Sequence, residues 1–464
     1  MGRENRQIIE GVIWKQLLIF FFPIMLGAFF QQLYNTVDAV IVGRCVGKEA
    51  LAAVGGPSGY LVNLLVGFFI GLCSGATVAV AQLFGAGDRE RTSRAVHTAM
   101  MLSLTAGTLM SVCGVLTAET ALKLMDTPPE VLPHAVGYLK IYFGGVLFMF
   151  VYNMGTAVLR AKGDSRRPFY MLVLATAVNI AGDVLFVAVM KKGVAGAAWA
   201  TVASQLVSAA GVWILLARED SVFKLRVSRL FRLDGTILSA MVRVGLPSGL
   251  QSTMYTLSNM VIQSTINGFG VDTVAAWTVC NKVERTYWLT LNALGIALST
   301  FSGQNFGARR YDRVVRSIHV SAALAGALSV LCGAVFMTWC RPLYRIFTDD
   351  PAVISLGLKI VRYVAPWYLL YVPVAILASG MRGTGDTAVP TVMTALGICG
   401  FRLLWIGFVV PLRRDVFTVF VSYPVSWALT SAFFLLYCWK GRWLQRSIFR
   451  AEGVSPEERP VRSE

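Results

Sequence analysis

The chain consists of long apolar stretches separated by short polar and charged segments. Each stretch exceeds the about 20 residues that an α-helix needs to cross the hydrocarbon core of a bilayer. The pattern therefore predicts an all-α integral membrane protein with twelve transmembrane helices, six in each half. The predicted spans are 14–42, 52–83, 95–117, 131–158, 168–190, 194–217, 236–266, 273–303, 314–340, 352–381, 388–411 and 416–439.

Composition and charge support this interpretation. The chain is 56% hydrophobic and 14% charged, whereas soluble domains carry about 25% charged residues. The net charge of +17 would suit a nucleic-acid partner, but the basic residues form no compact domain. They are concentrated, by roughly three to one, in the connections on the side that holds both termini. We expect a multi-pass protein of the inner cell membrane with cytoplasmic termini and no nucleic-acid partner.

Two short strings occur twice at one fixed distance. QLFGA at Gln82–Ala86 returns as QNFGA at Gln304–Ala308, and Arg160–Pro168 returns as Arg382–Pro390, in both cases 222 positions later. A repeat of nearly half the chain length indicates a duplication, and two related halves are typical of membrane transporters. We divide the chain into an N-lobe (1–217), a cytoplasmic linker (218–235), a C-lobe (236–440) and a cytoplasmic tail (441–464).

The repeated strings themselves are typical of turns. Gly85 and Gly307 are expected to end helices in the left-handed conformation. Asp164 and Asp386 are expected to cap the helices that follow them. Catalysis by these acids is not expected, and the chain lacks the motifs of hydrolases, metallopeptidases and P-loop ATPases. We therefore expect no enzymatic activity, no metal site and no cofactor.

Six motifs follow one another along the chain, at Phe22–Gly47, Ala81–Gly87, Leu159–Pro168, Asn179–Phe186, Gly303–Ala308 and Met381–Pro390. In this order they resemble the multidrug and toxin extrusion (MATE) transporters of the MOP exporter superfamily, and within them the DinF-like branch. The resemblance implies two six-helix lobes in a V, related by a pseudo-two-fold axis along the membrane normal. It also implies a monomer that exports drug-like, mostly cationic compounds in exchange for H⁺ or Na⁺ by alternating access, among membrane lipids. The same fold leaves a lipid-linked saccharide or lipid flippase as the alternative.

Three acids lie deep in predicted membrane segments: Asp38, Asp183 and Glu284. An ionisable group in hydrocarbon is costly and marks a functional site by default. Gln31, Tyr34 and Asp38 share one helix face, as do Asn179 and Asp183, because they are spaced by three or four residues. The resemblance assigns binding of the coupling cation to Asp38, Asn179, Asp183, Thr201, Tyr138 and Asn153. Candidates for the substrate cavity are Gln31, Tyr34, Asn35, Met149, Gln251 and Tyr255.

The second half does not reproduce the acids of the first. The positions that correspond to Asp38, Asn179 and Asp183 hold Ile262, Phe401 and Trp405. Coupling is therefore expected in the first half. In the second half we expect a polar cluster of Lys282, Glu284 and Arg402, with Glu284 paired to Arg402. Pro23 and Pro247 each remove a helical hydrogen bond and are expected to kink their helices.

Overall fold

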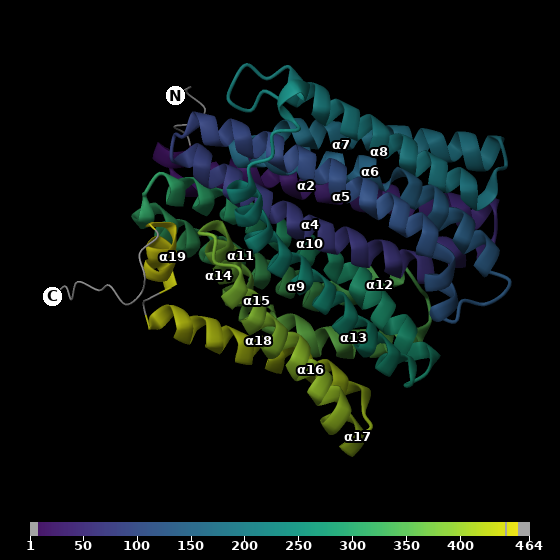
Figure 1. Cartoon of the computed structure of the whole chain (residues 1–464). Helices are drawn as coiled ribbons and strands as arrows, with labels where there is room; N and C mark the ends of the chain where they lie inside the picture. Colours follow the sequence, from purple (N-terminus) through teal and green to yellow (C-terminus); the bar gives the residue numbers. More distant parts are fainter. Residues whose placement is uncertain (1–7, 441–442, 453–464) are drawn as a thin grey trace. The chain divides into compact units, whose positions relative to one another are not determined.

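The structure is a computed structural model that describes residues 8–440 and 443–452. Over these residues the chain is helical and contains no strand (Figure 1). The first half comprises α2 (Ile13–Cys45), α3 (Lys48–Gly55), α4 (Pro57–Gly85), α5 (Arg89–Leu124), α6 (Leu132–Lys162), α7 (Arg166–Asp183), the π-helix η1 (Val184–Val189) and α8 (Gly193–Ala217).

The second half follows a connection that contains the 3₁₀-helix η2 (Val227–Arg229). It comprises α9 (Gly235–Asn267), α10 (Val271–Gly307), α11 (Tyr311–Thr338), α12 (Cys340–Arg345), α13 (Pro351–Val364), η3 (Ala365–Trp367), α14 (Tyr368–Gly383), α15 (Ala388–Thr394), η4 (Ala395–Gly400), α16 (Phe401–Leu404), η5 (Trp405–Val409), α17 (Val410–Leu412), α18 (Val416–Trp439) and α19 (Trp443–Glu452).

All twelve predicted spans are helical in the structure. Ten helices, counted over the described part of the chain, are long and apolar enough to cross a membrane. The other two predicted spans form α9 and α10, which have 33 and 37 residues but carry more polar side chains. The predicted all-α membrane architecture is confirmed.

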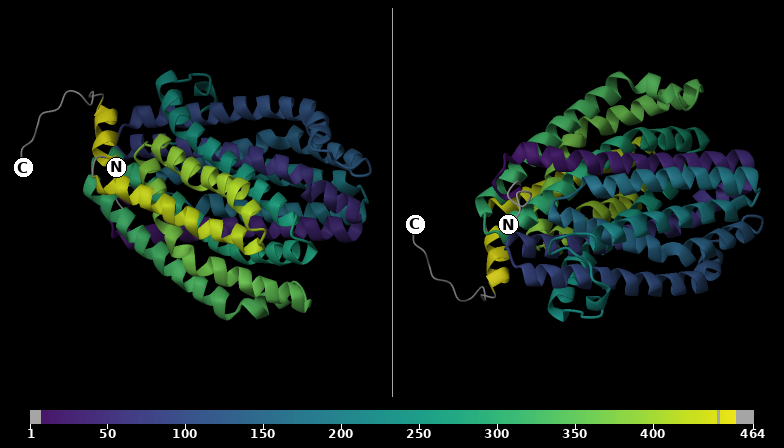
Figure 2. Two further views of the ribbon diagram at one scale, coloured as in Figure 1. Left: turned by 90° about the horizontal axis from the view of Figure 1, so that it is seen from below. Right: turned by 90° about the horizontal axis from the view of Figure 1, so that it is seen from above.

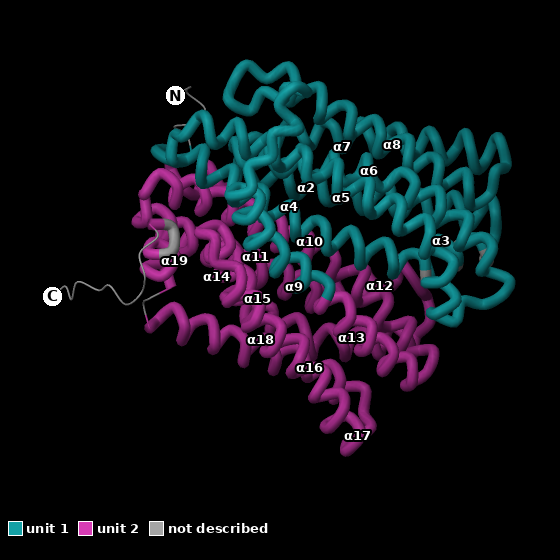
Figure 3. The backbone as a smooth tube through the Cα atoms, viewed as in Figure 1, with its two compact units in different colours: residues 1–11, 18–253 teal, residues 12–17, 254–464 magenta. Residues whose placement is uncertain are grey.

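The chain divides into two compact units (Figure 3). Unit 1 contains residues 1–11 and 18–253, and unit 2 contains residues 12–17 and 254–464. In unit 1, α6 packs against α4, α5 and α8, and α7 packs against α8. In unit 2, α10 packs against α11, α13 and α14, and α14 packs against α18. Figure 2 shows the long helices of the first half, purple to teal, running side by side.

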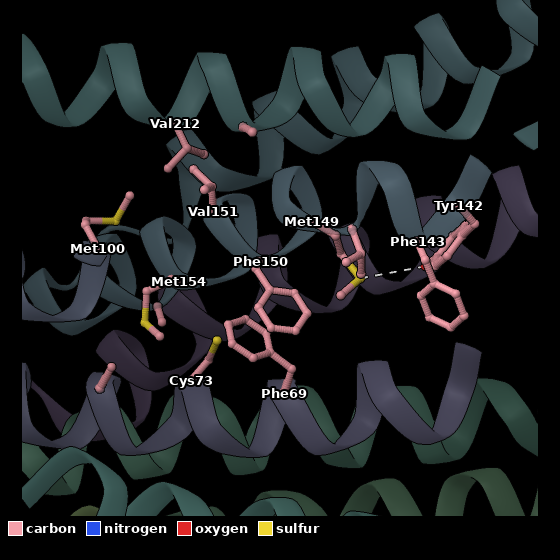
Figure 4. Close-up of a cluster of buried hydrophobic side chains, with 14 of the residues drawn as sticks. Phe69, Cys73, Met100, Tyr142, Phe143, Met149, Phe150, Val151, Met154 and Val212 are labelled. Carbon is pink, nitrogen blue, oxygen red and sulfur yellow. Dashed lines mark hydrogen bonds between the residues drawn. The ribbon is translucent and has the colours of Figure 1, made fainter. Parts of the chain in front are cut away.

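Unit 1 has a core of interlocking apolar side chains (Figure 4). Phe69 of α4 stacks on Phe150 of α6 with an interplanar angle of 18°. The Tyr142 hydroxyl donates to the Sδ atom of Met149 at 3.7 Å, which is a polar contact within this core. Because lipid tails are as apolar as these side chains, close packing rather than removal from water stabilises such a core.

Small residues bring α4 close to the first part of α9 within unit 1. A Cβ atom on Gly71 would lie 2.4 Å from the Gly249 nitrogen, and one on Gly75 would lie 2.1 Å from the Met241 oxygen. Neither backbone can move away without separating the helices. These glycines are therefore packing residues, as is usual for membrane helices.

The repeated strings form turns as predicted, with corrections at Gly85 and Gly307. Asp164 accepts hydrogen bonds from the backbone of Arg166 and Arg167 and so caps α7. The prediction for Gly85 was wrong, because the left-handed residue is Gly87 (φ 77°). The Asp88 nitrogen donates to the Leu83 oxygen. This bond is typical of a Schellman motif, in which the residue before the donor, here Gly87, is left-handed.

The second string repeats this turn two residues beyond Gly307. There Arg309 has the left-handed φ of 58°, and the Arg310 nitrogen donates to the Asn305 oxygen. The prediction for Gly307 was therefore wrong in the same way. Of the predicted tail, 443–452 forms α19, while 441–442 and 453–464 lie outside the described residues.

Candidate functional site

The predicted coupling site centres on Asp183, the last residue of α7. The helix continues directly into the π-helix η1, and such local widening is frequent at functional sites. Asp183 is fully buried, and neither carboxylate oxygen has a hydrogen-bond partner among the described residues. One turn earlier, Asn179 is also buried, and both polar atoms of its amide are unpartnered within the same described part.

Asp38 reaches this site from α2. Its side chain is buried, and its Oδ1 atom has no hydrogen-bond partner in the described structure. Asp38 lies within electrostatic range of Asp183, and both acids lie within range of the Tyr138 hydroxyl on α6. The structure thus brings four of the six predicted coupling residues together from three helices: Asp38, Tyr138, Asn179 and Asp183.

Thr201 lies on α8, which approaches α7 closely at this level. A Cβ atom on Gly182 would lie 3.0 Å from that of Ala200, and these two residues adjoin Asp183 and Thr201. The Thr201 hydroxyl donates to the Ala197 oxygen at 3.0 Å. Its oxygen retains a lone pair that can accept a proton donor or a cation.

The sequence reasoning missed Gln205, one turn beyond Thr201. Its Oε1 atom is buried and has no hydrogen-bond partner among the described residues. The signal was available, because polar residues at Thr201, Gln205 and Ser208 follow the spacing of one helix face. Gln205 therefore extends the polar stripe of α8.

Asn153 is oriented differently from the other predicted coupling residues. Its Nδ2 atom donates to the Met149 oxygen within α6 at 2.8 Å. That bond is local to the helix, so the structure gives Asn153 no contact with the two acids among the interactions of the described residues.

The site contains several buried polar atoms that a bound proton or cation would satisfy. A buried polar group without a partner costs free energy, and an unpaired buried charge costs far more. In the described part of unit 1, the carboxylates of Asp38 and Asp183 and the amides of Asn179 and Gln205 have buried atoms without partners, and no cationic side chain pairs with the two acids. No group of three His, Cys, Asp or Glu side chains there is arranged to hold a metal ion. The donors fit H⁺, or Na⁺ held by carboxylate, amide and hydroxyl oxygens.

The predicted substrate-cavity residues are divided between the two units. Gln31, Tyr34, Asn35, Met149 and Gln251 belong to unit 1, whereas Tyr255 belongs to unit 2. Gln31 and Asn35 are exposed on α2, although they lie in a membrane-spanning helix. The Tyr255 hydroxyl lies 3.1 Å from that of Tyr371. The substrate cavity as a whole stays a prediction.

The predicted ion pair in the second half is not formed. Glu284 is buried and accepts from Cys280 and from the Trp288 indole. Arg402 is buried over the Tyr423 ring, 4.0 Å from its centroid, and donates to Ser426. The two residues share Tyr423 as a common neighbour.

Lys282 does not join this cluster either. Its ammonium group is on the exposed side of α10, over the Phe347 ring at 5.4 Å. The expected cluster failed because an aromatic ring stabilises a buried guanidinium as an acid would, and nothing in helical spacing distinguishes the two.

Comparison with known proteins places these features in a family. The chain is 28% identical over 449 residues to "Probable multidrug resistance protein YoeA" of Bacillus subtilis, covering 94% of this chain and 96% of the relative. It is 24% identical to "Probable multidrug resistance protein NorM" of Thermotoga maritima, covering 95% and 96%. A solved structure described as MATE in the bent conformation superposes with a TM-score of 0.88 at 21% identity, covering 97% of this chain and 100% of that one.

The MatE family profile matches both halves separately, at residues 23–185 and 247–406. The two matched segments correspond to the duplication found in the sequence. Together they cover most of the chain, and the two relatives, each covered to 96% of its length, are named as multidrug resistance proteins. This chain is therefore a multi-pass membrane transporter that belongs to the MATE family.

Proposed function

We propose that this transporter is a secondary antiporter of the DinF-like branch, which exports organic, mostly cationic compounds in exchange for H⁺ bound at Asp38 and Asp183. The observation that carries the proposal is the set of buried, unpartnered oxygens on Asp183, Asn179 and Asp38. Multidrug resistance is the function in the names of two relatives, which supports a drug-like substrate. The proposal includes a monomer in the inner membrane with both termini cytoplasmic.

The acids supply the coupling by alternating between two forms. A carboxylate without a partner is costly inside the membrane, so a proton entering from one side is bound there. Release of that proton to the other side leaves an unpaired charge that favours rearrangement of the surrounding helices. Two acids within electrostatic range resist being ionised together, which suits a site that always holds at least one exchangeable proton.

Proton coupling is preferred over sodium coupling because of the donor set. Na⁺ is a hard cation that needs several oxygen ligands at once. The oxygen ligands near the acids are the two carboxylates, the Asn179 amide and the lone pair of the Thr201 hydroxyl. Asn153 has no contact with the acids among the interactions of the described residues. One proton on either acid satisfies the site with fewer ligands.

The experiment is dye efflux from proteoliposomes that contain the full chain. Either a pH gradient or a Na⁺ gradient is imposed, and wild type is compared with Asp38→Asn and Asp183→Asn. The matched control is Asp349→Asn, which removes an exposed carboxylate. We expect efflux with the pH gradient alone, its loss in both site variants, and its retention in the control. Efflux by both site variants at the wild-type rate refutes the proposal. Efflux driven only by a Na⁺ gradient would show that the coupling ion is Na⁺ rather than H⁺.

A further inference from the structure

A second polar site lies in unit 1 away from the two acids. A cavity of about 1260 Å³ opens between the first turns of α5 and the connection from α8 to α9. The connection is the one drawn as a teal loop between these helices in Figure 1. The connection begins and ends at membrane-spanning helices. The cavity beside it therefore lies at the edge of the membrane rather than inside it.

The connection is a fixed wall of this cavity. Phe223, Leu225 and Leu230 are buried, and the Phe223 ring packs edge-on against Phe84 at 4.8 Å. The backbone nitrogen of Arg226 donates to Nε2 of the buried His97 at 3.0 Å. The backbone that carries the side chains facing the cavity is therefore held in place.

The acids that line the cavity are already neutralised. Glu219 binds both Lys162 and Arg167, in the latter case at 2.8 Å. Burial raises the pKa of Glu219, but the hydrogen bonds from these two cations outweigh burial, so the pKa is lowered and the group is ionised. The remaining pairs are Asp220 with Lys224, Glu90 with Arg94, and Asp88 with Arg91.

Four arginines of the lining have no such partner. No ion pair joins their side chains to any acid among residues 8–440 and 443–452. Once the acids are counted with their own cations, the cavity therefore carries an excess of positive charge. An arginine presents a planar fork of donors that matches a phosphate group. These residues are Arg89, Arg226, Arg229 and Arg232.

The same connection also exposes large apolar side chains. Val227, Phe231 and Leu233 are 62%, 77% and 49% exposed, and they alternate with the arginines. Basic residues interleaved with exposed aromatic and aliphatic ones are characteristic of segments that lie in the lipid headgroup region. A free phosphate compound in water would not use Phe231, whereas a phospholipid would.

We propose that this cavity binds the headgroup of an anionic phospholipid, with its phosphate among Arg226, Arg229 and Arg232 and its acyl chains beside Phe231. Basic segments next to membrane helices gain about fivefold in affinity for anionic lipid per arginine. The site is distinct from the ion-coupling acids, and its failure would leave the proposed antiport unaffected.

The test is native mass spectrometry of the full chain in detergent with equal amounts of phosphatidylglycerol and phosphatidylcholine. We expect wild type to bind phosphatidylglycerol first. The variant Arg226→Gln/Arg229→Gln/Arg232→Gln should lose about a hundredfold in affinity for it. The matched control, Arg341→Gln/Arg345→Gln/Arg414→Gln, removes the same charge from exposed positions outside the cavity and should keep the preference.

A second measurement separates lipid from soluble phosphate. Phe231→Ser should weaken phosphatidylglycerol binding severalfold while any change of the unfolding temperature by inorganic pyrophosphate stays as in wild type. If the triple variant does not fold, the single variant Arg229→Gln, at an exposed position, replaces it with an expected fivefold loss. Three results overturn the assignment: no preference for phosphatidylglycerol in wild type, an equal loss in the control, or arginine-dependent stabilisation by pyrophosphate without lipid selectivity.

Discussion

The helix that ends in Asp183 and its counterpart in the second half both widen into a π-helix at corresponding places, but the chemistry there differs. In the first, the π-helix η1 begins directly after Asp183; in the second, η5 begins at Trp405, the position 222 residues later. Asp183 has no partner for its carboxylate among the described residues. Trp405 instead donates its indole N–H to the Thr418 oxygen at 2.9 Å and packs on Phe401.

The comparison separates what duplication preserves from what function requires. A widened helical turn depends on how neighbouring helices pack, so both halves retain it. An unpaired buried acid is costly, so it persists where something repays that cost. In this protein the unpaired acid is Asp183 in unit 1. At the corresponding position in unit 2, Trp405 has a hydrogen-bond partner and packs against another aromatic ring.

The comparison is tested most directly by replacing Asp183 and Trp405 with close analogues. We expect Asp183→Asn to abolish ion-driven dye efflux in proteoliposomes, because the variant cannot exchange a proton. Trp405→Phe should lower efflux by less than about tenfold, since it loses a single hydrogen bond worth about 1 kcal/mol. Equal effects of the two substitutions would show that the halves share the coupling.

The next largest effect is expected at Glu219, which binds the cations of the first repeated string. Glu219→Gln removes the acid that Lys162 and Arg167 share, while Arg167 keeps its ion pair with Asp164, and should lower the free energy of unfolding by about 2 kcal/mol. The folded pKa of Glu219 lies below its ordinary value. Its contribution is therefore complete above about pH 4.3 and is lost as the pH falls below that value.

Thermal unfolding of the purified chain at pH 7 and pH 4 checks this prediction. Wild type should lose more stability than Glu219→Gln between the two pH values, because the variant has no group to protonate at that position. If Glu219→Gln were as stable as wild type at pH 7, the ion pairs of Glu219 would not contribute to the stability of the fold.

A smaller effect is expected at the matching place in the second string. Thr384 occupies the position of Lys162 and lies 3.2 Å from the Ser447 hydroxyl of α19. Thr384→Val should cost about 1 kcal/mol and raise hydrogen exchange in 443–452. Unchanged exchange there would mean that α19 is held by its apolar contacts alone.

The smallest effect is expected at the two helix-interior prolines. Pro23 lies inside α2, which carries Asp38, whereas Pro247 lies inside α9, which carries no acid. Pro23→Ala supplies a missing backbone donor and should stiffen α2, slowing efflux by about threefold, and Pro247→Ala should slow it less. Transport rates and ion dependence identical to wild type in Pro23→Ala would remove the hinge hypothesis.

Much of the fold could be predicted from the sequence because it depends on local properties. The length of an apolar run determines whether a helix can span the bilayer, and all twelve runs became helices. The repeat of the strings at Gln82 and Arg160 revealed two related halves. The spacing of Asn179 and Asp183 placed them on one face of one helix, and in the structure both are buried without hydrogen-bond partners among the described residues.

The tertiary structure alone decided which helix faces meet. Periodicity orients a side chain about its own helix, but it contains no information on the neighbour. For that reason the sequence could not show that Asp38 approaches Asp183, or that Tyr423 rather than Glu284 covers Arg402. The cavity beside Arg226, Arg229 and Arg232 likewise exists only because buried Phe223 and Leu230 hold a polar connection against α5.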